Sequence, residues 1–222
     1  MRHPNLLKIA AAALASAIGL VGAPLTVSTY SMLNGATGSF NYRDFTYIPC
    51  AGICDTTGAA LSGGKGKLTD GVSPALDWFQ QGQNTQWVGW DSSQGLLNPA
   101  VTFNFSQSVT VNTVTIWASN SRTGGVALPS NIIIGGTNFV IAPDTSNTSP
   151  RALVFSALNF TGSSLTVQLN QSASPWVIIG EVSFDGSSSS VIPEPSSLVL
   201  VGCAIPLLAF AYRSRRRGPC RT

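Results

Sequence analysis

The chain has almost no histidine. Its single histidine is His3, at the extreme N-terminus of the 222 residues. The rest of the sequence therefore excludes a Ser-His-Asp or Cys-His nucleophile, acid–base catalysis by histidine, and a histidine metal site. An enzyme would have to use carboxylates alone, and these are scattered, with no two at a spacing that indicates a glycosidase pair. We therefore expect a protein that is not an enzyme.

Charge is also scarce, at 9% of the residues, and the net charge of +3 misleads because the basic excess lies at the two ends. Between residues 29 and 185, five basic and eight acidic side chains leave a net charge of −3. No basic stripe with interleaved aromatic residues remains there. This distribution excludes nucleic acid as an expected partner.

Only four cysteines are present, and two of them, Cys50 and Cys54, share a segment that contains proline and glycine. Two interpretations stay open. In an oxidising compartment the pair would form a local disulfide, whereas a metal site would need a second pair of ligands that the sequence does not supply. We expect the disulfide.

The C-terminus combines Pro193, Glu194 and Pro195, an uncharged run over residues 196–212, and a final basic cluster. The cluster consists of Arg213, Arg215, Arg216 and Arg217. Seventeen helical residues span about 25 Å, close to the roughly 30 Å hydrocarbon core of a bilayer. The run therefore predicts a C-terminal transmembrane helix, with the arginines in the cytoplasm and the body outside. A plain membrane anchor is the simplest interpretation.

This order of motif, apolar run and basic cluster resembles the PEP-CTERM sorting signal of Gram-negative bacteria that produce exopolysaccharide. The resemblance, over residues 193–222, implies that an exosortase recognises the tail and cleaves it near the Pro-Glu-Pro motif. It also implies that the membrane anchor is transient, and that the protein then reaches the cell surface or the extracellular matrix.

The N-terminus agrees with export. Arg2 and Lys8 precede an apolar run over residues 9–23, the pattern of a secretory signal peptide, which we assign to residues 1–28. Cleavage after Ala23 and cleavage after Ser28 both stay open.

The body predicts an all-β fold because short stretches of alternating apolar and polar residues are separated by turns. The expected strands cover residues 100–105, 109–117, 131–134, 138–141, 153–155, 165–169 and 176–184. Asn112 and Thr113 interrupt the alternation and predict a bulge, and Gly135-Gly136-Thr137 predicts a hairpin-like turn. The only helical signal is a short turn near residues 75–80. This pattern favours a single jelly-roll β-sandwich over residues 65–185. A strand-and-loop segment precedes it at 29–64, and a Ser-rich linker follows at 186–192.

Four segments of the body carry a second resemblance. They are Leu68-Thr69-Asp70-Gly71, Thr85-Gln86-Trp87, the strand pair from residue 101 to 116, and the closing strand at 179–184. Together they resemble a galactose-binding-like, discoidin-type jelly roll. Two departures are Val72, where the family often has Asp or Asn, and the insertion of residues 73–84.

The resemblance implies a structural calcium ion that joins the first loop to the closing strand, with Asp70 and Glu181 as its carboxylate ligands and backbone carbonyls as the others. The simpler interpretation is that Asp70 caps its own turn and that Glu181 is a lone charge at a strand edge.

Members of this family that bind glycans use loops at one end of the sandwich. Sugar recognition needs aromatic faces together with amide, carboxylate or guanidinium groups. The residues that supply these groups in the candidate loops are Trp78, Phe79, Trp90, Asn120 and Arg122. Each has a competing structural role: Trp78 and Phe79 would cover a sheet edge, and Trp90 would pack in the core.

These features predict an exported, non-catalytic surface protein that binds bacterial polysaccharide. The alternative is a structural or adhesion protein of the extracellular matrix that binds other proteins. Ice binding is a further alternative, because tails of this kind also occur on proteins described as ice-binding. However, Thr110, Thr113 and Thr115 form only a short run of threonines.

Overall fold

The computed structural model describes residues 22–50, 52–81, 86–146 and 148–188. The N-terminal leader up to residue 21 lies outside these residues, as do the Pro-Glu-Pro motif, the apolar run 196–212 and the arginine cluster. Among the described residues, no helix has the length and apolar character needed to cross a membrane.

Strands dominate the described part of the chain. In order they are β1 (Ala23–Pro24), β2 (Val27–Leu33), β3 (Ala60–Gly64), β4 (Val88–Asp91), β5 (Ala100–Ala118), β6 (Asn131–Ile134), β7 (Thr137–Val140), β8 (Arg151–Phe155), β9 (Phe160–Asn170) and β10 (Trp176–Ser188). The helical elements are η1 (Lys67–Thr69), α1 (Trp78–Gln81) and η2 (Ser92–Gln94). The prediction of an all-β fold with one short helical turn is confirmed.

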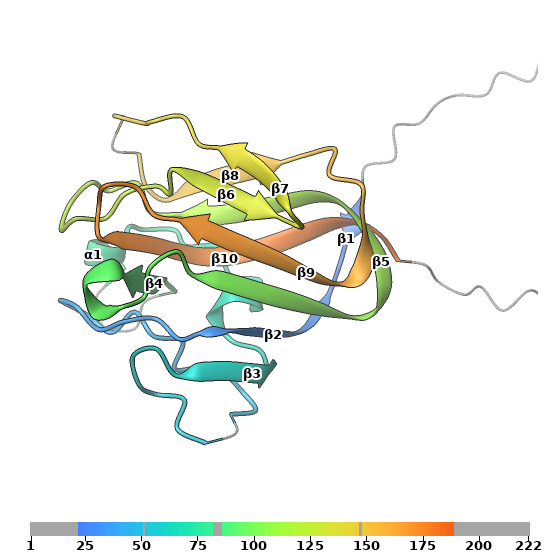
Figure 1. Cartoon of the computed structure of the whole chain (residues 1–222), viewed down its shortest axis with the longest axis horizontal. Coiled ribbons are helices and arrows are strands. Elements are labelled where there is room, and N and C mark those ends of the chain that lie inside the picture. The colour runs from blue at the N-terminus through green and yellow to red at the C-terminus, as the bar shows by residue number, and fades with distance from the viewer. Residues whose placement is uncertain (1–21, 51, 82–85, 147, 189–222) are drawn as a thin grey trace, which may run out of the picture. The chain divides into compact units, whose positions relative to one another are not determined.

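The strands form a sandwich of two layers joined by β5 (Figure 1). One layer has the order β3-β2-β5-β9-β6-β7, and every neighbouring pair in it is antiparallel. In the other layer β10 pairs with β1, β4 and β5. The first half of β5 pairs with β2 and its second half with β8, so this strand belongs to both layers.

The sequence predicted two strands where the structure has the single strand β5. Residues 106–108 are exposed but remain extended, and the register against β9 shifts between Asn104 and Val109. The predicted break at Asn112 and Thr113 is present as two successive half-buried residues. It falls where the partner of β5 changes from β9 to β8.

The hairpin between β6 and β7 lies where it is predicted, but its turn is one residue shorter, because Thr137 is the first residue of β7. Ile134 pairs with Thr137, and the two intervening residues, Gly135 and Gly136, have φ angles of +56° and +88°. Two consecutive positive φ angles are the requirement of a type I′ turn, which only glycine meets without strain.

Aromatic rings from three strands fill the centre of the sandwich. Tyr30 of β2, Phe103 of β5 and Phe184 of β10 are all fully buried. The ring of Phe103 lies 5.9 Å from that of Tyr30 and 4.9 Å from that of Phe184. Burial of a side chain of this size contributes about 1.5–3 kcal/mol. The N-terminal strand β2 is therefore an integral part of the core.

Strand β10 connects the two ends of the sandwich. Its first residue, Trp176, pairs with Asp91 of β4, and Gly186 near its end pairs with Ala23 of β1. Figure 1 shows α1 and β4 at one end and β1 at the other. The last described residue, Ser188, thus lies at the end opposite to α1.

Candidate functional site

The short helix α1 is fixed by its capping residue. The carboxylate of Asp77 accepts a 2.7 Å hydrogen bond from the backbone N–H of Trp78, and Gln80 Oε1 accepts one of 3.2 Å from the backbone N–H of Asp77. The bond to Gln80 is one half of a capping box, whereas the carboxylate of Asp77 bonds to the adjacent N–H and not to that of Gln80. Asp77 also accepts a 2.8 Å hydrogen bond from Ser119 Oγ, and Trp78 Nε1 donates one of 2.8 Å to Ser121 Oγ. The helix is thereby held against the loop that follows β5.

An aromatic cluster forms beside this helix. Tyr42 lies between two indoles, with its ring centroid 5.7 Å from that of Trp78 and 5.2 Å from that of Trp176, both edge to face. Phe40 extends the cluster, 6.2 Å from Trp78. Burial raises the pKa of Tyr42 to about 12, so its hydroxyl is neutral at physiological pH. The loop after β2, helix α1 and the start of β10 supply these rings. They meet because the sheet brings the start of β10 next to the loop after β2.

The cluster forms the wall of a cavity of about 240 Å³, which we call the aromatic pocket. Its lining consists of Gly38, Ser39, Tyr42, Trp78, Asp91, Gln94, Gly124, Val126, Trp176 and Ile178. The pocket lies at the α1 end of the sandwich. It combines apolar ring surface with a hydroxyl, an amide and a carboxylate, the groups that hydrogen-bond to sugar hydroxyls.

Two glycines lie close to the indole rings of the pocket wall, in which Trp78 is buried and Trp176 half-buried. A Cβ atom on Gly38 would lie 2.9 Å from Trp176 Cζ2, and one on Gly124 would lie 3.2 Å from Trp78 Cη2. Gly124 also has a φ of +62°, a conformation that other residues rarely adopt. Larger residues at either position would displace the indoles or cover them.

Asp91 is the residue of the pocket lining with a charged side chain. Its Oδ1 accepts a 2.9 Å hydrogen bond from the backbone N–H of Ser93. Its Oδ2 accepts bonds of 2.7 Å from Ser93 Oγ and 3.1 Å from Gln94 Nε2. Asp91 is the N-cap of η2, which fixes the carboxylate in place. The amide of Gln94 also donates to the carbonyl of Thr37, so this side chain is held as well.

The structure separates the five predicted glycan contacts. Trp78 lines the pocket, whereas Phe79 and Arg122 are exposed but lie outside its lining. The prediction for Trp90 is wrong, because its side chain is fully buried in the main core and its Nε1 donates to the carbonyl of Leu33. Asn120 is buried and does not belong to the pocket lining.

The sequence analysis missed most of the pocket. Tyr42 lies in a loop and Gln94 in the short η2, and neither segment has a periodic signal in the sequence, while Trp176 is predicted only as the start of a strand. The one available signal was Pro175-Trp176, a large aromatic residue directly after a loop, at the edge where β10 begins.

The predicted calcium ligands lie together. The carboxyl of Glu181 is buried beside that of Asp70, and its Oε2 has no hydrogen-bond partner. Burial, reinforced by Asp70, raises the pKa of Glu181 to about 8. The hydroxyl of Thr69 is also buried without a partner. Two adjacent carboxyls and unpartnered oxygens fit a cation that prefers oxygen ligands. Within the described residues, however, no group of three or more His, Cys, Asp or Glu side chains lies together.

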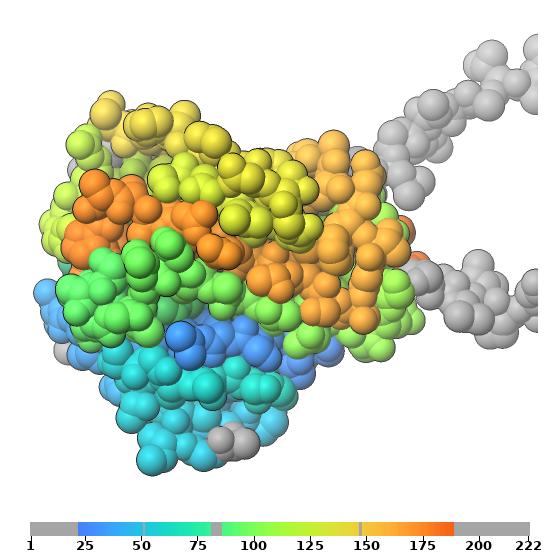
Figure 2. All heavy atoms as spheres, viewed as in Figure 1, coloured from blue at the N-terminus to red at the C-terminus, as the bar shows by residue number. Residues whose placement is uncertain are grey.

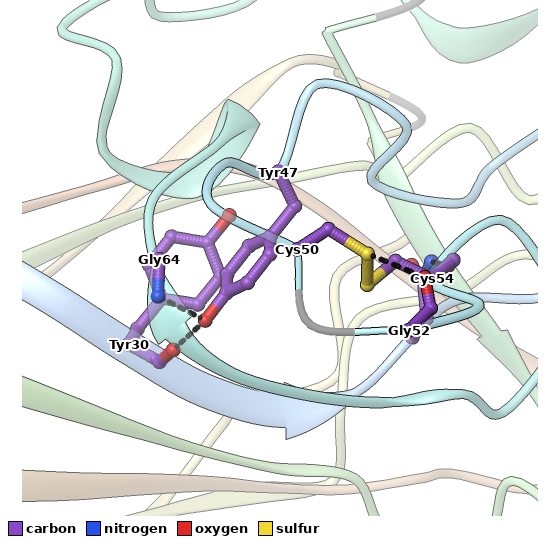
Figure 3. Close-up of a disulfide and its surroundings, with 7 residues drawn as sticks. Tyr30, Tyr47, Cys50, Gly52, Cys54 and Gly64 are labelled. Atoms are coloured by element: carbon purple, nitrogen blue, oxygen red, sulfur yellow. Dashed lines mark hydrogen bonds between the residues drawn. A yellow bond between two sulfur atoms is a disulfide. The ribbon is translucent and has the colours of Figure 1, made fainter.

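Cys50 and Cys54 form a disulfide, with their Cα atoms 6.1 Å apart (Figure 3). The adjoining Tyr47 ties this loop to the sandwich: its hydroxyl donates to the carbonyl of Tyr30 and accepts a 2.7 Å bond from the backbone N–H of Gly64. The disulfide loop is therefore attached to both β2 and β3.

A buried polar cluster lies beneath the same loop. Asp44 is 1% exposed and accepts hydrogen bonds from the hydroxyl of Tyr30 and the backbone N–H of Lys67. The Lys67 ammonium donates a 2.8 Å bond to the carbonyl of Arg43 and lies 3.7 Å from the ring centroid of Phe45. Burial lowers the pKa of Lys67 to about 8, although Asp44 and Asp70 oppose this shift.

Comparison with known proteins gives a family match over most of the body. Residues 26–186 match the family described as "Discoidin domain-containing receptor 1/2, DS-like domain". No curated protein matches the chain.

Several solved structures are similar to the chain at low identity. One is a fucose binding module of Streptococcus pneumoniae, with 13% identity, 55% of this chain and 81% of that chain covered, and a TM-score of 0.38. Another is the family 32 carbohydrate-binding module of C. perfringens NanJ in complex with galactose, with 11% identity, coverage of 46% and 78%, and a TM-score of 0.33. A third is the C-terminal domain of a chitobiase from Bacteroides fragilis, with 11% identity, coverage of 76% and 100%, and a TM-score of 0.41.

Proposed function

The chain belongs to the family of discoidin-type DS-like domains, and from this premise we propose that it is a non-catalytic carbohydrate-binding module. The observation that carries the proposal is the aromatic pocket, in which the rings of Tyr42, Trp78 and Trp176 adjoin the polar groups of Ser39, Gln94 and Asp91. The named modules that bind fucose and galactose are consistent with the proposal and do not establish it.

The pocket has the composition of a small-ligand site. Such sites combine apolar and aromatic walls with a few fixed polar groups. The aromatic wall would pack against the C–H face of a sugar ring, and the fixed amide and carboxylate would bind its hydroxyls. Residues 29–185 contain no histidine, which supports binding without histidine-based catalysis.

A glycan panel tests this proposal. Residues 24–188 contain strands β2 to β10 and the second residue of β1. This segment would be titrated against bacterial polysaccharides and their oligosaccharides. We expect saturable binding that falls at least tenfold in the Trp78→Ala variant. If the folded domain binds none of these glycans, the proposal fails.

We further propose that the protein is exported and that an exosortase processes its tail at Pro193, Glu194 and Pro195. The proposal is supported by the sequence, in which the Pro-Glu-Pro motif, the uncharged run 196–212 and the arginine cluster follow one another in this order.

Mass spectrometry of the mature protein tests this export route. In a host that has an exosortase, we expect the wild-type C-terminus to end near residue 195, and a variant with alanine at positions 193–195 to keep its arginine cluster. An unprocessed wild-type tail would contradict it. For the signal peptide, we expect cleavage after Ala23, because Val27 is buried in the core and Leu25 donates a backbone hydrogen bond to Phe184.

A structural calcium ion between the first loop and β10 is part of the proposal. Asp70 and Glu181 would supply its carboxylates, with Thr69 and backbone carbonyls as candidate further ligands. The ion would neutralise two adjacent carboxyls and fix the start of the closing strand to η1. It would take no part in sugar binding.

A second candidate function, self-association in a matrix, is favoured by the outer face of the layer that contains β2, β5 and β9. Strands β2, β3, β6, β7 and β9 and the first half of β5 contain no Asp, Glu, Lys or Arg. The outward side chains bond to one another, as in the 2.9 Å contact between the hydroxyls of Thr102 and Thr166 and the 3.2 Å bond from Asn104 to Thr29. Figure 2 shows β2 (blue), β5 (green) and β9 (orange) side by side on this face.

Two copies that meet at this face would place no like charges opposite one another, although each body carries a net charge of −3. Sedimentation velocity over a range of protein concentrations would detect such association. We expect Thr102→Lys to abolish it, and Thr115→Lys, on the second half of β5, to leave it unchanged. A body that stays monomeric at the highest concentration would remove this candidate.

A further inference from the structure

The aromatic pocket has an uneven charge distribution. Of its ten lining residues, Asp91 is the only one with a charged side chain. The other polar groups in the lining are neutral: the hydroxyls of Ser39 and Tyr42 and the amide of Gln94. No arginine or lysine lines the pocket, so a carboxylate or sulfate on a ligand would find no ionic partner there.

A further carboxylate near the pocket increases the negative charge around it. Asp77 lies directly behind Trp78, where it is 4% exposed and has no ion-pair partner among the described residues. Arg122 lies two residues before Gly124, but its side chain is exposed and outside the lining. Arg151, which pairs with Ala118 next to Ser119, also lies at this end, and it forms an ion pair with Asp144. Asp77 therefore adds a second buried carboxylate close to the pocket.

Asp91 cannot move out of the way of a ligand. The hydrogen bonds from Ser93 and Gln94 hold both of its oxygens, and its side chain is 5% exposed. A buried, fixed charge interacts with a neighbouring charge more strongly than a solvated one does, because little water screens it. An anionic ligand in the pocket would face this repulsion at short range.

The size of the pocket limits what can enter. Pockets for drug-sized ligands have volumes of roughly 300–1,000 Å³, and the aromatic pocket has about 240 Å³. Gly38 and Gly124 lie against the indole rings and leave a space that suits one sugar ring.

We infer that the aromatic pocket selects a single uncharged sugar ring and rejects uronic acids and other anionic sugars, with Asp91 as the residue that sets this specificity. The inference rests on the proposed carbohydrate-binding function and extends it to a substrate class. For a polysaccharide, the recognised unit is then a neutral residue, whatever charge the rest of the polymer carries.

The test compares sugars that differ only in a carboxylate. Residues 24–188 would be titrated with glucose and glucuronic acid, and with galactose and galacturonic acid, at 20 mM and 500 mM salt. We expect each neutral sugar to bind on the order of tenfold more tightly than its uronic acid at low salt. The ratio should shrink at high salt, which screens the charge.

Two variants test whether Asp91 causes the preference for neutral sugars. In Asp91→Asn, which retains a residue suited to capping η2, we expect the ratio between neutral and anionic affinities to fall towards one. Asp185→Asn removes a carboxylate at the opposite end of the sandwich and should leave the ratio as in the wild type. If Asp91→Asn does not fold, the salt dependence of the wild-type ratio carries the test.

The outcomes separate this inference from the function on which it rests. If uronic acids bind as tightly as neutral sugars or more tightly, the inference is overturned while the carbohydrate-binding proposal stands. Tighter uronic acid binding that is lost in Arg122→Gln would overturn it and assign recognition to Arg122. If no sugar binds to the folded domain, both fail together.

Discussion

The indole of Trp78 donates a 2.8 Å hydrogen bond to the hydroxyl of Ser121, 43 positions later in the chain. The bond links α1 to the loop that follows β5, and both partners are buried. One wall of the aromatic pocket therefore depends on a contact between two segments that are distant in sequence. This contact makes the first prediction possible.

Replacement of Ser121 by alanine should destabilise the domain by about 1–3 kcal/mol, because it leaves the buried indole N–H of Trp78 without an acceptor. Urea unfolding followed by tryptophan fluorescence measures the change. Ser93→Ala provides a comparison at an exposed serine, although it removes one bond to Asp91, and we expect a smaller loss there. Equal losses in the two variants would contradict the proposed role of the Trp78–Ser121 bond.

Calcium should stabilise the domain through Asp70 and Glu181. We expect the melting temperature to rise when calcium is added to chelator-treated protein and to fall again with EDTA. The rise should be largely lost in Glu181→Gln and retained in Asp185→Asn, which alters a carboxylate elsewhere on β10. A melting temperature that does not respond to calcium or to EDTA would rule out the ion.

Stability should increase with pH between about 8 and 10. Burial lowers the pKa of Lys67 to about 8 in the folded state, whereas the unfolded chain holds this proton up to its ordinary pKa of 10.5. The unfolded state then binds more protons over this interval, so the free energy of unfolding rises with pH, by on the order of 2 kcal/mol. Burial also raises the pKa values of Tyr30 and Tyr47, which opposes the trend above pH 10.

Lys67→Met should flatten this pH dependence, and Lys65→Met, at an exposed lysine, should not. The comparison is made by urea unfolding in EDTA, so that calcium does not contribute. A wild-type stability that is constant or falls from pH 8 to pH 10 would show that the ammonium is well solvated.

Removal of the disulfide should cost about 2 kcal/mol. Cys50 and Cys54 close a loop of five residues, and the entropy of the unfolded chain rises by the corresponding amount when this loop is opened. The double variant Cys50→Ser/Cys54→Ser, compared with the wild type by urea unfolding, measures this loss. An unchanged midpoint would mean that the bonds of Tyr47 to β2 and β3 hold the loop without the disulfide.

The sequence predicted the parts of the fold that depend on local patterns. Strand β6 has its predicted bounds, and a hairpin turn lies at the predicted glycines, because alternation and turn chemistry are properties of neighbouring residues. The merger of two predicted strands into β5 was not visible, since Ser106, Gln107 and Ser108 resemble a loop when their partner strands are unknown.

The pocket depends on long-range contacts, and the sequence predicted only one of its aromatic residues. Whether a tryptophan lines a pocket or packs in the core is decided by its neighbours in space. Trp90 of β4 pairs with Val177, and Trp176 of β10 pairs with Asp91, so the two tryptophans occupy neighbouring positions of adjacent strands. Trp90 is nevertheless fully buried and Trp176 only half-buried. The proximity of Asp70 and Glu181 is predicted only by the resemblance to a family, because composition alone does not indicate it. The structure places the two carboxyls next to each other.

The central claim, that the aromatic pocket binds a sugar, is tested most directly by isothermal titration of residues 24–188 with the glycan that binds best in the panel. The wild type is compared with Trp176→Ala, which removes one of the three rings of the aromatic wall, and with Phe160→Ala, which removes a half-buried ring outside the pocket. The account predicts at least a tenfold loss of affinity for Trp176→Ala and none for Phe160→Ala. Equal affinity in the wild type and a folded Trp176→Ala variant would contradict it.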